Sequence, residues 1–188
     1  MPNHITNRLT IDGTKEQIAE VLEFIKYDEL GIGTIDFNKI TPMPPWIFQG
    51  NLGREEEEKY GKENCWYDWS IKNWGTKWNA YHQLHDRSSA EDGVVYFDTA
   101  WSGVPELMSK LARIFPDVTF YYEFADEDFG NNVGQYVFRG LIINGGRLSD
   151  MSKEAVELAS DLKEVDLETE EEYGLRFDET KNRYVWSD

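Results

Sequence analysis

Residues 94–125, VVYFDTAWSGVPELMSKLARIFPDVTFYYEFA, contain the patterns of a strand, a helix and a second strand in succession. Residues 94–101 are rich in β-branched and aromatic side chains, which favour a strand. Pro105 suits the first turn of a helix, whose apolar stripe consists of Leu107, Met108, Leu111 and Ile114 or Phe115. Apolar residues then alternate from Val118 to Phe124, as in a strand with one buried face. The stretch therefore predicts a β-α-β unit.

The beginning of the chain predicts a similar unit. Residues 5–11 alternate, with Asn7 on the apolar face and Arg8 on the other, which indicates a half-buried strand. Thr14 and Gln17 have the spacing of a capping box, and the helix that follows is expected to stop near Gly31. A short strand is expected over residues 34–40.

The segment between the two units is predicted to be an insertion over residues 42–92. Three prolines within residues 42–45 exclude a helix or a central strand. Residues 51–74 read as a helix that breaks at Gly61 and stops at Gly75. Residues 76–84 look extended, and residues 85–93 form a polar loop. The second core strand is therefore either 34–40 or 78–84; the latter is favoured, paired with 94–101.

The remaining elements are short. Strands are expected at 135–139 and 141–147, with Asn144–Gly145 as a hairpin signal. Ser152 caps a helix to Leu162, and residues near Val185 predict an edge strand. The order predicts an α+β, ferredoxin-like split β-α-β fold with an aromatic helical insertion and extra C-terminal strands and helix. The domain is expected over residues 1–147, and residues 148–188 form an acidic extension packed on it or trailing from it.

Four segments together resemble the YubB-type ferredoxin-like proteins, which are carried by plasmids, phages and other mobile elements. They are MPNHITNRLTI (1–11), FNKITPMP (37–44), WYDWSIKNWGTKWNA (66–80) and FDTAWSGVPELMSKLARIFP (97–116). The resemblance runs from Met1 to about Arg147. It implies the ferredoxin-like fold and a mobile-element setting, but no activity and no catalytic residues. The family name describes topology: one cysteine, Cys65, cannot hold an iron–sulfur cluster.

Composition limits the classes of function. The 188 residues carry a net charge of −17, which argues against direct nucleic-acid binding and favours a protein partner with a basic surface. The last 39 positions hold 13 acidic and 5 basic residues. No apolar run is long enough to span a membrane, and no signal peptide is visible. With a single cysteine, these features predict a cytoplasmic protein, a monomer or a small oligomer.

The candidate site centres on the tryptophan-rich stretch 66–78. Its rings are expected to form an aromatic core over the open face of the sheet, with a stacking platform as the alternative. Arg8 and Asp98 are expected on adjacent strands, as an ion pair or the floor of a site. The predicted binding residues are Arg8, Asn73, Trp74, Lys77, Trp78, Asn79, Asp98 and Trp101.

Other chemistry is not expected. His82 and His85 have ligand-like spacing for a helix, but on a strand they would point to opposite faces, so no metal site is predicted. No cofactor is predicted, and neither glycine-rich stretch (129–135, 144–147) matches a phosphate loop; both are read as turns. Nothing near Cys65 indicates an activated thiol.

We therefore expect a non-enzymatic protein-binding or regulatory module, one form of which is an anti-defence inhibitor that mimics nucleic acid with its acidic face. The first alternative is a small hydrolase or nucleotide-processing enzyme at the open face of the sheet, which would use Asp98, Arg8 and a histidine. The second is a phage structural protein.

Overall fold

A five-stranded antiparallel sheet organises the chain. The computed structural model describes residues 2–83 and 86–187. The sheet has the order β2 (Val94–Ala100), β1 (His4–Asp12), β3 (Thr119–Asp126), β4 (Gly134–Arg139) and β5 (Ile142–Arg147). Because β2 and β3 are both antiparallel to β1, they are parallel to each other, and helix α5 (Pro105–Ile114) joins them. This split β-α-β arrangement confirms the predicted α+β, ferredoxin-like fold.

The main core lies between the sheet and the helices on one face. Helix α1 (Lys15–Ile25) starts with the predicted capping box of Thr14 and Gln17, and α5 starts with Pro105. Both pack with the apolar face of β1. Helix α1 ends at Ile25 rather than near Gly31. The chain turns there because Tyr27 donates a backbone hydrogen bond to Thr34 Oγ1, and the carbonyl of Ile25 accepts from Asp36.

Neither candidate for the second core strand is a strand. Asp36 caps a short helix, α2 (Phe37–Ile40), where the sequence predicted a strand over residues 34–40. In the segment 76–83, only Tyr81 bridges to Asp98, at the outer edge of β2; Leu84 lies outside the described residues. The Asn79 side chain accepts hydrogen bonds from the backbone amides of Phe37 and Ala80, so side-chain hydrogen bonds replace the backbone hydrogen bonds of a strand pair.

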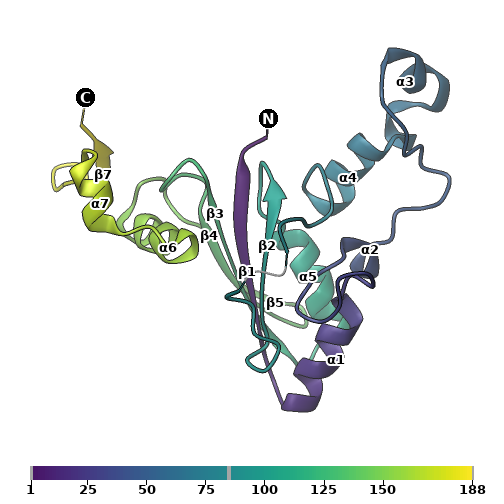
Figure 1. Ribbon diagram of the computed structural model, residues 1–188, viewed down its shortest axis with the longest axis horizontal. Helices are drawn as coiled ribbons and strands as arrows, with labels where there is room; N and C mark the ends of the chain where they lie inside the picture. The colour runs from purple at the N-terminus through teal and green to yellow at the C-terminus, as the bar shows by residue number, and fades with distance from the viewer. Residues whose placement is uncertain (1, 84–85, 188) are drawn as a thin grey trace.

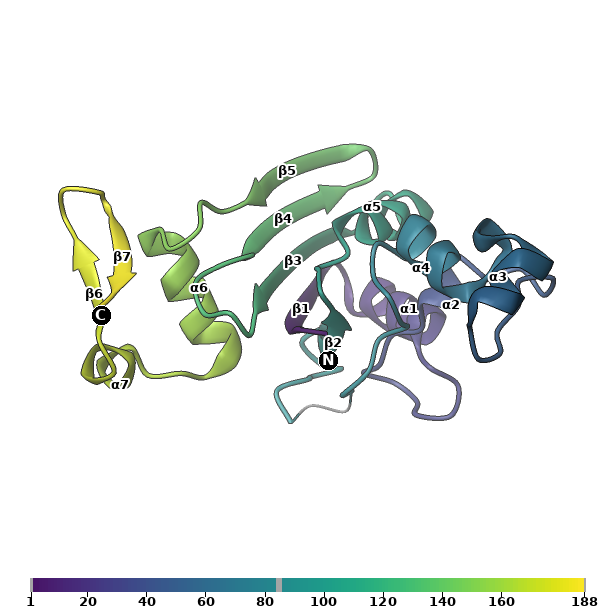
Figure 2. The same ribbon diagram turned by 90° about the horizontal axis from the view of Figure 1, so that it is seen from above.

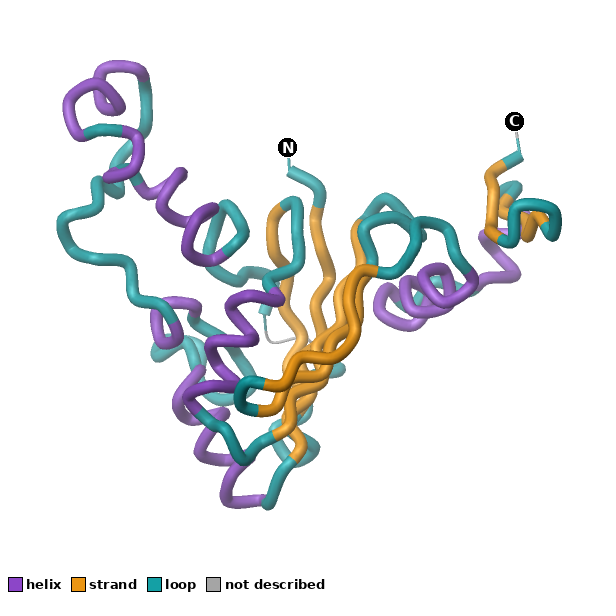
Figure 3. Tube along the Cα trace, turned by 180° about the vertical axis from the view of Figure 1, so that it is seen from behind, coloured by secondary structure: helices purple, strands orange, loops and turns teal. Residues whose placement is uncertain are grey.

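The insertion extends the helical layer. It comprises α3 (Arg54–Tyr60), the 3₁₀ turn η1 (Lys62–Asn64) and α4 (Trp66–Trp74). Gly61 interrupts the helix, and Gly75 ends it with φ +83°, as predicted. Trp74 joins the core on the α1 and α5 side. The expectation that the tryptophans cover the open face is wrong, because helix α6 (Lys153–Lys163) packs there instead. Figure 1 shows α6 on one side of the sheet and α1, α2 and α5 on the other, and Figure 3 shows the same layers from behind.

The C-terminal part adds two hairpins. Strands β4 and β5 turn at Gly140, whose φ is +57°, whereas Asn144 and Gly145 lie inside β5; the predicted turn at 144–145 is therefore misplaced. Ser152 caps α6 as predicted. After α7 (Leu167–Glu172), β6 (Leu175–Asp178) pairs with β7 (Arg183–Trp186), so the strand near Val185 exists but belongs to a separate sheet. Figure 2 shows this hairpin beyond α6.

Among the described residues, no helix has the length and apolarity needed to cross a membrane. The predicted domain limits, 1–147 with the insertion 42–92 and the extension 148–188, stay a prediction. Within the extension, α6 packs against β1 and β3.

Candidate functional site

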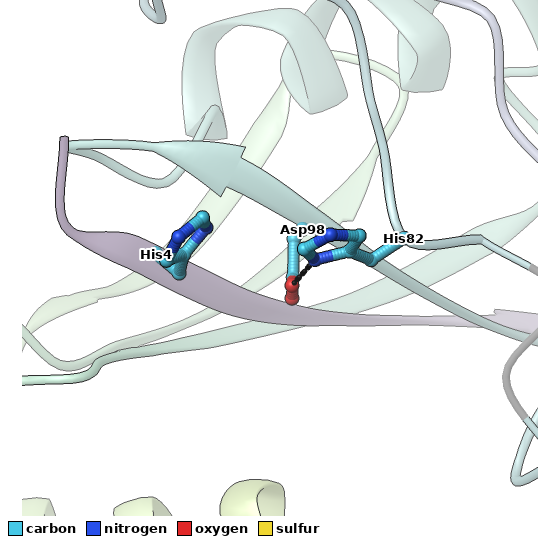
Figure 4. A group of neighbouring side chains, drawn as sticks. All are labelled: His4, His82 and Asp98. Carbon is cyan, nitrogen blue, oxygen red and sulfur yellow. Dashed lines mark hydrogen bonds and ion pairs between the residues drawn. The ribbon is translucent and has the colours of Figure 1, made fainter. Parts of the chain in front are cut away.

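Three metal-ligating side chains meet on the α6 face of the sheet. His4 comes from the start of β1, Asp98 from β2, and His82 from the segment that precedes the polar loop (Figure 4). One ligand atom from each lies within 4.8 Å of the others. We call these three residues the histidine–aspartate group.

The register of the sheet places this group. Thr6 of β1 pairs with Asp98, so Asp98 lies on the same face as Thr6, and His4 follows two positions away on that face. Tyr81 bridges Asp98 from the other side. His82 would point to the opposite face in a regular strand, but its φ of +46° turns its ring toward Asp98. Such a backbone conformation is costly for a non-glycine residue and is often found at functional sites.

Hydrogen bonds orient the two imidazole rings. The Tyr81 hydroxyl donates to the carbonyl of Thr99 at 3.1 Å, so in its 2.9 Å contact with His4 the donor is Nδ1 of His4. Burial, together with the charges of Asp98 and Glu127, raises the pKa of Tyr81 to about 12, so the Tyr81 hydroxyl keeps its proton. His82 Nδ1 donates to Asp98 Oδ2 at 2.8 Å. In the neutral imidazole of His4, the lone pair is then on Nε2.

A pocket of about 270 Å³ lies beside the group, between the sheet and the end of α6. Its lining includes Thr6, His82, Asp98 and Lys163. Burial lowers the pKa of Lys163, an effect that Asp98 and other nearby carboxylates oppose. The pocket is therefore lined by an aspartate–histidine pair and an ammonium group. Groups of this kind bind cations or transfer protons.

Arg8 and Asp98 lie on adjacent strands, as predicted, but they do not form the expected ion pair. Arg8 Nε bonds Glu123 at 2.6 Å, and its Nη1 bonds Asp161 of α6 at 2.7 Å. Burial alone would lower the pKa of Arg8, but these hydrogen bonds and the one that Arg8 Nη1 donates to the hydroxyl of Tyr96 raise it above its ordinary value. Arg8 therefore joins β1, β3 and α6.

Three of the predicted binding residues form hydrogen bonds that stabilise the fold. Trp74 is buried, and its Nε1 donates to the carbonyl of Thr41. Asn73 donates to the carbonyl of Trp69 within α4. Asn79 donates to Asp36 and accepts from backbone amides. The structure does not bring these three residues together with Asp98.

The other three predicted residues, Lys77, Trp78 and Trp101, do meet, and Tyr67 joins them. The Lys77 Nζ lies 4.4 Å from the ring centroid of Trp78, 5.2 Å from that of Trp101 and 5.9 Å from that of Tyr67. Trp78 and Trp101 are exposed. Trp101 has φ +70°, and its backbone is held by hydrogen bonds to Asn3 and Asn132. We call these four residues the Lys77 cluster.

Sequence reasoning missed His4, Tyr81 and Lys163 as members of a site. They come from segments far apart in the chain, and only the topology brings them together. The spacing of His82 and His85 is the one signal in the sequence for a histidine site, but His85 lies outside the described residues. Cys65 is buried, and burial together with nearby glutamates raises the pKa of its thiol, which fits the absence of an activation signal in the sequence.

Comparison with known proteins agrees with this architecture. A family model described as the ferredoxin-like domain in Api92-like protein matches residues 74–170, more than half of the chain. The matched part includes the Lys77 cluster except Tyr67, and it includes His82, Asp98 and Lys163 but not His4. No curated protein and no solved structure matches the chain. The ferredoxin-like family predicted from the sequence is confirmed, and the YubB-type relationship stays a prediction. The chain belongs to the family of ferredoxin-like domains found in Api92-like proteins.

Proposed function

We propose that the chain is a protein-binding module that acts without catalysis, and that its partner presents a basic surface. The observation that carries this proposal is the Lys77 cluster, where three rings surround an ammonium group at a partly exposed position. Aromatic faces attract ammonium and guanidinium groups, with a gain of about 0.5–2 kcal/mol. A lysine or arginine of the partner would take the place of Lys77, whose long side chain can rotate into solvent.

The acidic surface supports a basic partner. Helices α3 and α7 each carry four glutamates and bury no residue. They lie toward opposite ends of the molecule in Figure 1. Among the described residues, no ion pair involves the glutamates of α7. With a net charge of −17, such a surface would steer a basic protein toward the chain and disfavour nucleic acid.

One form of the proposal is mimicry of nucleic acid. The acidic surface would then capture a basic DNA-handling protein and inhibit it, for instance as an anti-defence protein of a mobile element. The resemblance to YubB-type proteins supports this setting. The single buried cysteine, Cys65, fits a cytoplasmic location.

The proposal is tested by affinity capture from a cell lysate with purified wild-type protein and three variants. We expect discrete basic proteins to be retained at low salt and released at high salt. Trp78→Ala and Trp101→Ala should weaken this retention. Trp46→Ala should not, because Trp46 is 73% exposed but lies outside the cluster. Retention of no basic protein at low salt, or equal retention by all variants, would contradict the proposal.

A second candidate function is hydrolysis at the histidine–aspartate group. The specific observation in its favour is the 2.8 Å bond between His82 and Asp98, an arrangement in which the carboxylate orients an imidazole as a general base. Turnover of chromogenic ester and phosphodiester substrates by the wild type, lost in His82→Gln, would support it. Equal rates in the two proteins would exclude a role of His82.

A further inference from the structure

We propose that His4, His82 and Asp98 bind a divalent transition-metal ion, Zn²⁺ in the first instance, at a site open to solvent on the α6 face of the sheet. This inference does not depend on the proposed partner binding, which rests on the Lys77 cluster. It rests on the convergence of two imidazoles and one carboxylate from three separate segments (Figure 4).

The present geometry is close to that of a metal site. Zinc bonds of about 2.0–2.1 Å place tetrahedral ligands about 3.3 Å apart. Nδ1 of His82 and Oδ2 of Asp98 are already 2.8 Å apart and share a proton. The ion would take the place of that proton, and His82 would carry its proton on Nε2 instead. The side chain of His82 is 68% exposed, so a small rotation meets little resistance.

His4 would supply the third ligand. Its Nδ1 contacts the Tyr81 hydroxyl, so Nε2 of the neutral ring is the nitrogen that would bind the ion. A hydrogen bond at the non-ligating nitrogen fixes both the tautomer and the ring orientation in known metal sites. The Tyr81 hydroxyl is itself held by the carbonyl of Thr99. One ligand atom of each of the three residues lies within 4.8 Å of the others, so rotations of the two rings would complete the site.

The donor set selects the class of ion. Two imidazoles and one carboxylate suit Zn²⁺, Co²⁺, Ni²⁺ or Cu²⁺, whereas Ca²⁺ and Mg²⁺ need six or more oxygen ligands. Three protein ligands leave one tetrahedral position for water, as in catalytic rather than structural zinc sites.

The surrounding charges have both signs. The backbone amide of Glu127 donates a hydrogen bond to the carbonyl of His4. Asp126 and Glu127 therefore lie close to His4 and add negative charge near the site. Lys163 faces the same pocket from α6 and opposes the ion. We therefore expect a moderate affinity, below that of a buried structural zinc site.

The test uses the full-length chain without a polyhistidine tag. Calorimetric titration with Zn²⁺ and absorption spectroscopy with Co²⁺ should show one ion per chain. His4→Gln, His82→Gln and Asp98→Asn should each weaken binding by at least about tenfold. The matched control is Asp28→Asn, which changes an exposed aspartate that is paired with Lys39, and it should bind as the wild type does.

A second measurement needs no substitution. In the wild-type protein, the imidazole NMR signals of His4 and His82 should shift or broaden on addition of Zn²⁺ in step with the calorimetric binding. The proposal is overturned if the wild type binds no ion, if the two histidine variants bind as tightly as the wild type, or if neither imidazole responds.

Discussion

A buried hydrogen-bond network fixes the centre of the sheet at the residue scale. Asn7 is fully buried, and its Nδ2 donates to the carbonyl of Phe97 and to Thr99 Oγ1. Its Oδ1 accepts from the Tyr122 hydroxyl at 2.6 Å, and that hydroxyl accepts from the amide of Val104. In the described part of the chain, every buried side-chain nitrogen and oxygen has a partner. The network ties β1 and β3 to the start of α5.

The Tyr122 hydroxyl is the centre of that network, and Tyr122→Phe tests it. The substitution leaves the Oδ1 of Asn7 and the amide of Val104 without a partner, and each buried unsatisfied group costs about 1–3 kcal/mol. We expect the free energy of unfolding to fall by that amount or more in chemical denaturation. Tyr121→Phe, at an exposed neighbour on the same strand, should change it by less than about 0.5 kcal/mol. Equal effects of the two substitutions would contradict this account.

At the scale of elements, the β6–β7 hairpin depends on one turn residue. Asp178 Oδ1 accepts hydrogen bonds from the hydroxyl and amide of Thr180 and from the amide of Lys181. The Thr180 hydroxyl is the main cause that lowers the pKa of Asp178 to about 2. Because the folded value lies below the unfolded value of about 3.9, the contribution of this turn is complete above about pH 4 and is lost as the pH falls through about 2.

NMR titration of the Asp178 carboxyl carbon measures this directly. We expect a midpoint near pH 2 in the wild type, and a rise toward the ordinary aspartate value in Thr180→Ala, which lacks the hydroxyl. The amide signals of Thr180 and Lys181 should move in the same pH range. A titration midpoint near the usual aspartate pKa in the wild type would show that the hydrogen bonds of the turn do not stabilise the Asp178 carboxylate.

Local pattern was enough to predict most elements. The alternation of residues 5–11 and 118–124, the capping box at Thr14 and the breaks at Gly61 and Gly75 are effects within one element, and the structure has them all. The second core strand was mispredicted because Asp36 and Asn79 bond the nearby backbone in place of a strand partner. That competition depends on contacts 43 positions apart, which a local pattern does not contain.

The candidate sites show the same limit. Lys77 and Trp78 belong to the tryptophan-rich segment and Trp101 ends the neighbouring strand, and the structure brings these three together. Of the histidine–aspartate group, the sequence predicts Asp98 and an unspecified histidine, but not the approach of both His4 and His82 to Asp98. That approach requires the left-handed backbone of His82, which leaves no mark in the local sequence.

At the scale of the whole molecule, β5 is the exposed edge of the main sheet. Ile142 and Ile143 are 60% and 49% exposed, and an apolar edge strand favours pairing with another chain. We expect Ile142→Lys to reduce concentration-dependent self-association in light scattering, with little change in stability. Ile114→Lys, at an exposed isoleucine at the end of α5, is the matched control and should associate as the wild type does. A wild type that is monomeric at all concentrations would contradict the prediction.

Under the proposed function, the charge distribution and the Lys77 cluster have separate roles in binding a basic partner. The glutamates of α3 and α7 spread negative charge along its length, while the cluster offers rings for one cationic side chain. Long-range attraction and a specific contact are then provided by different parts of the chain.

The most direct test of this claim is an NMR titration of the seven tryptophan indole signals with a lysine-rich peptide at low salt. We expect the signals of Trp78 and Trp101 to shift in a saturable way. The signals of Trp74, whose indole donates to Thr41, and of the exposed Trp46 should stay in place. Small, uniform shifts of all seven signals, or no shift of Trp78 and Trp101, would contradict the account.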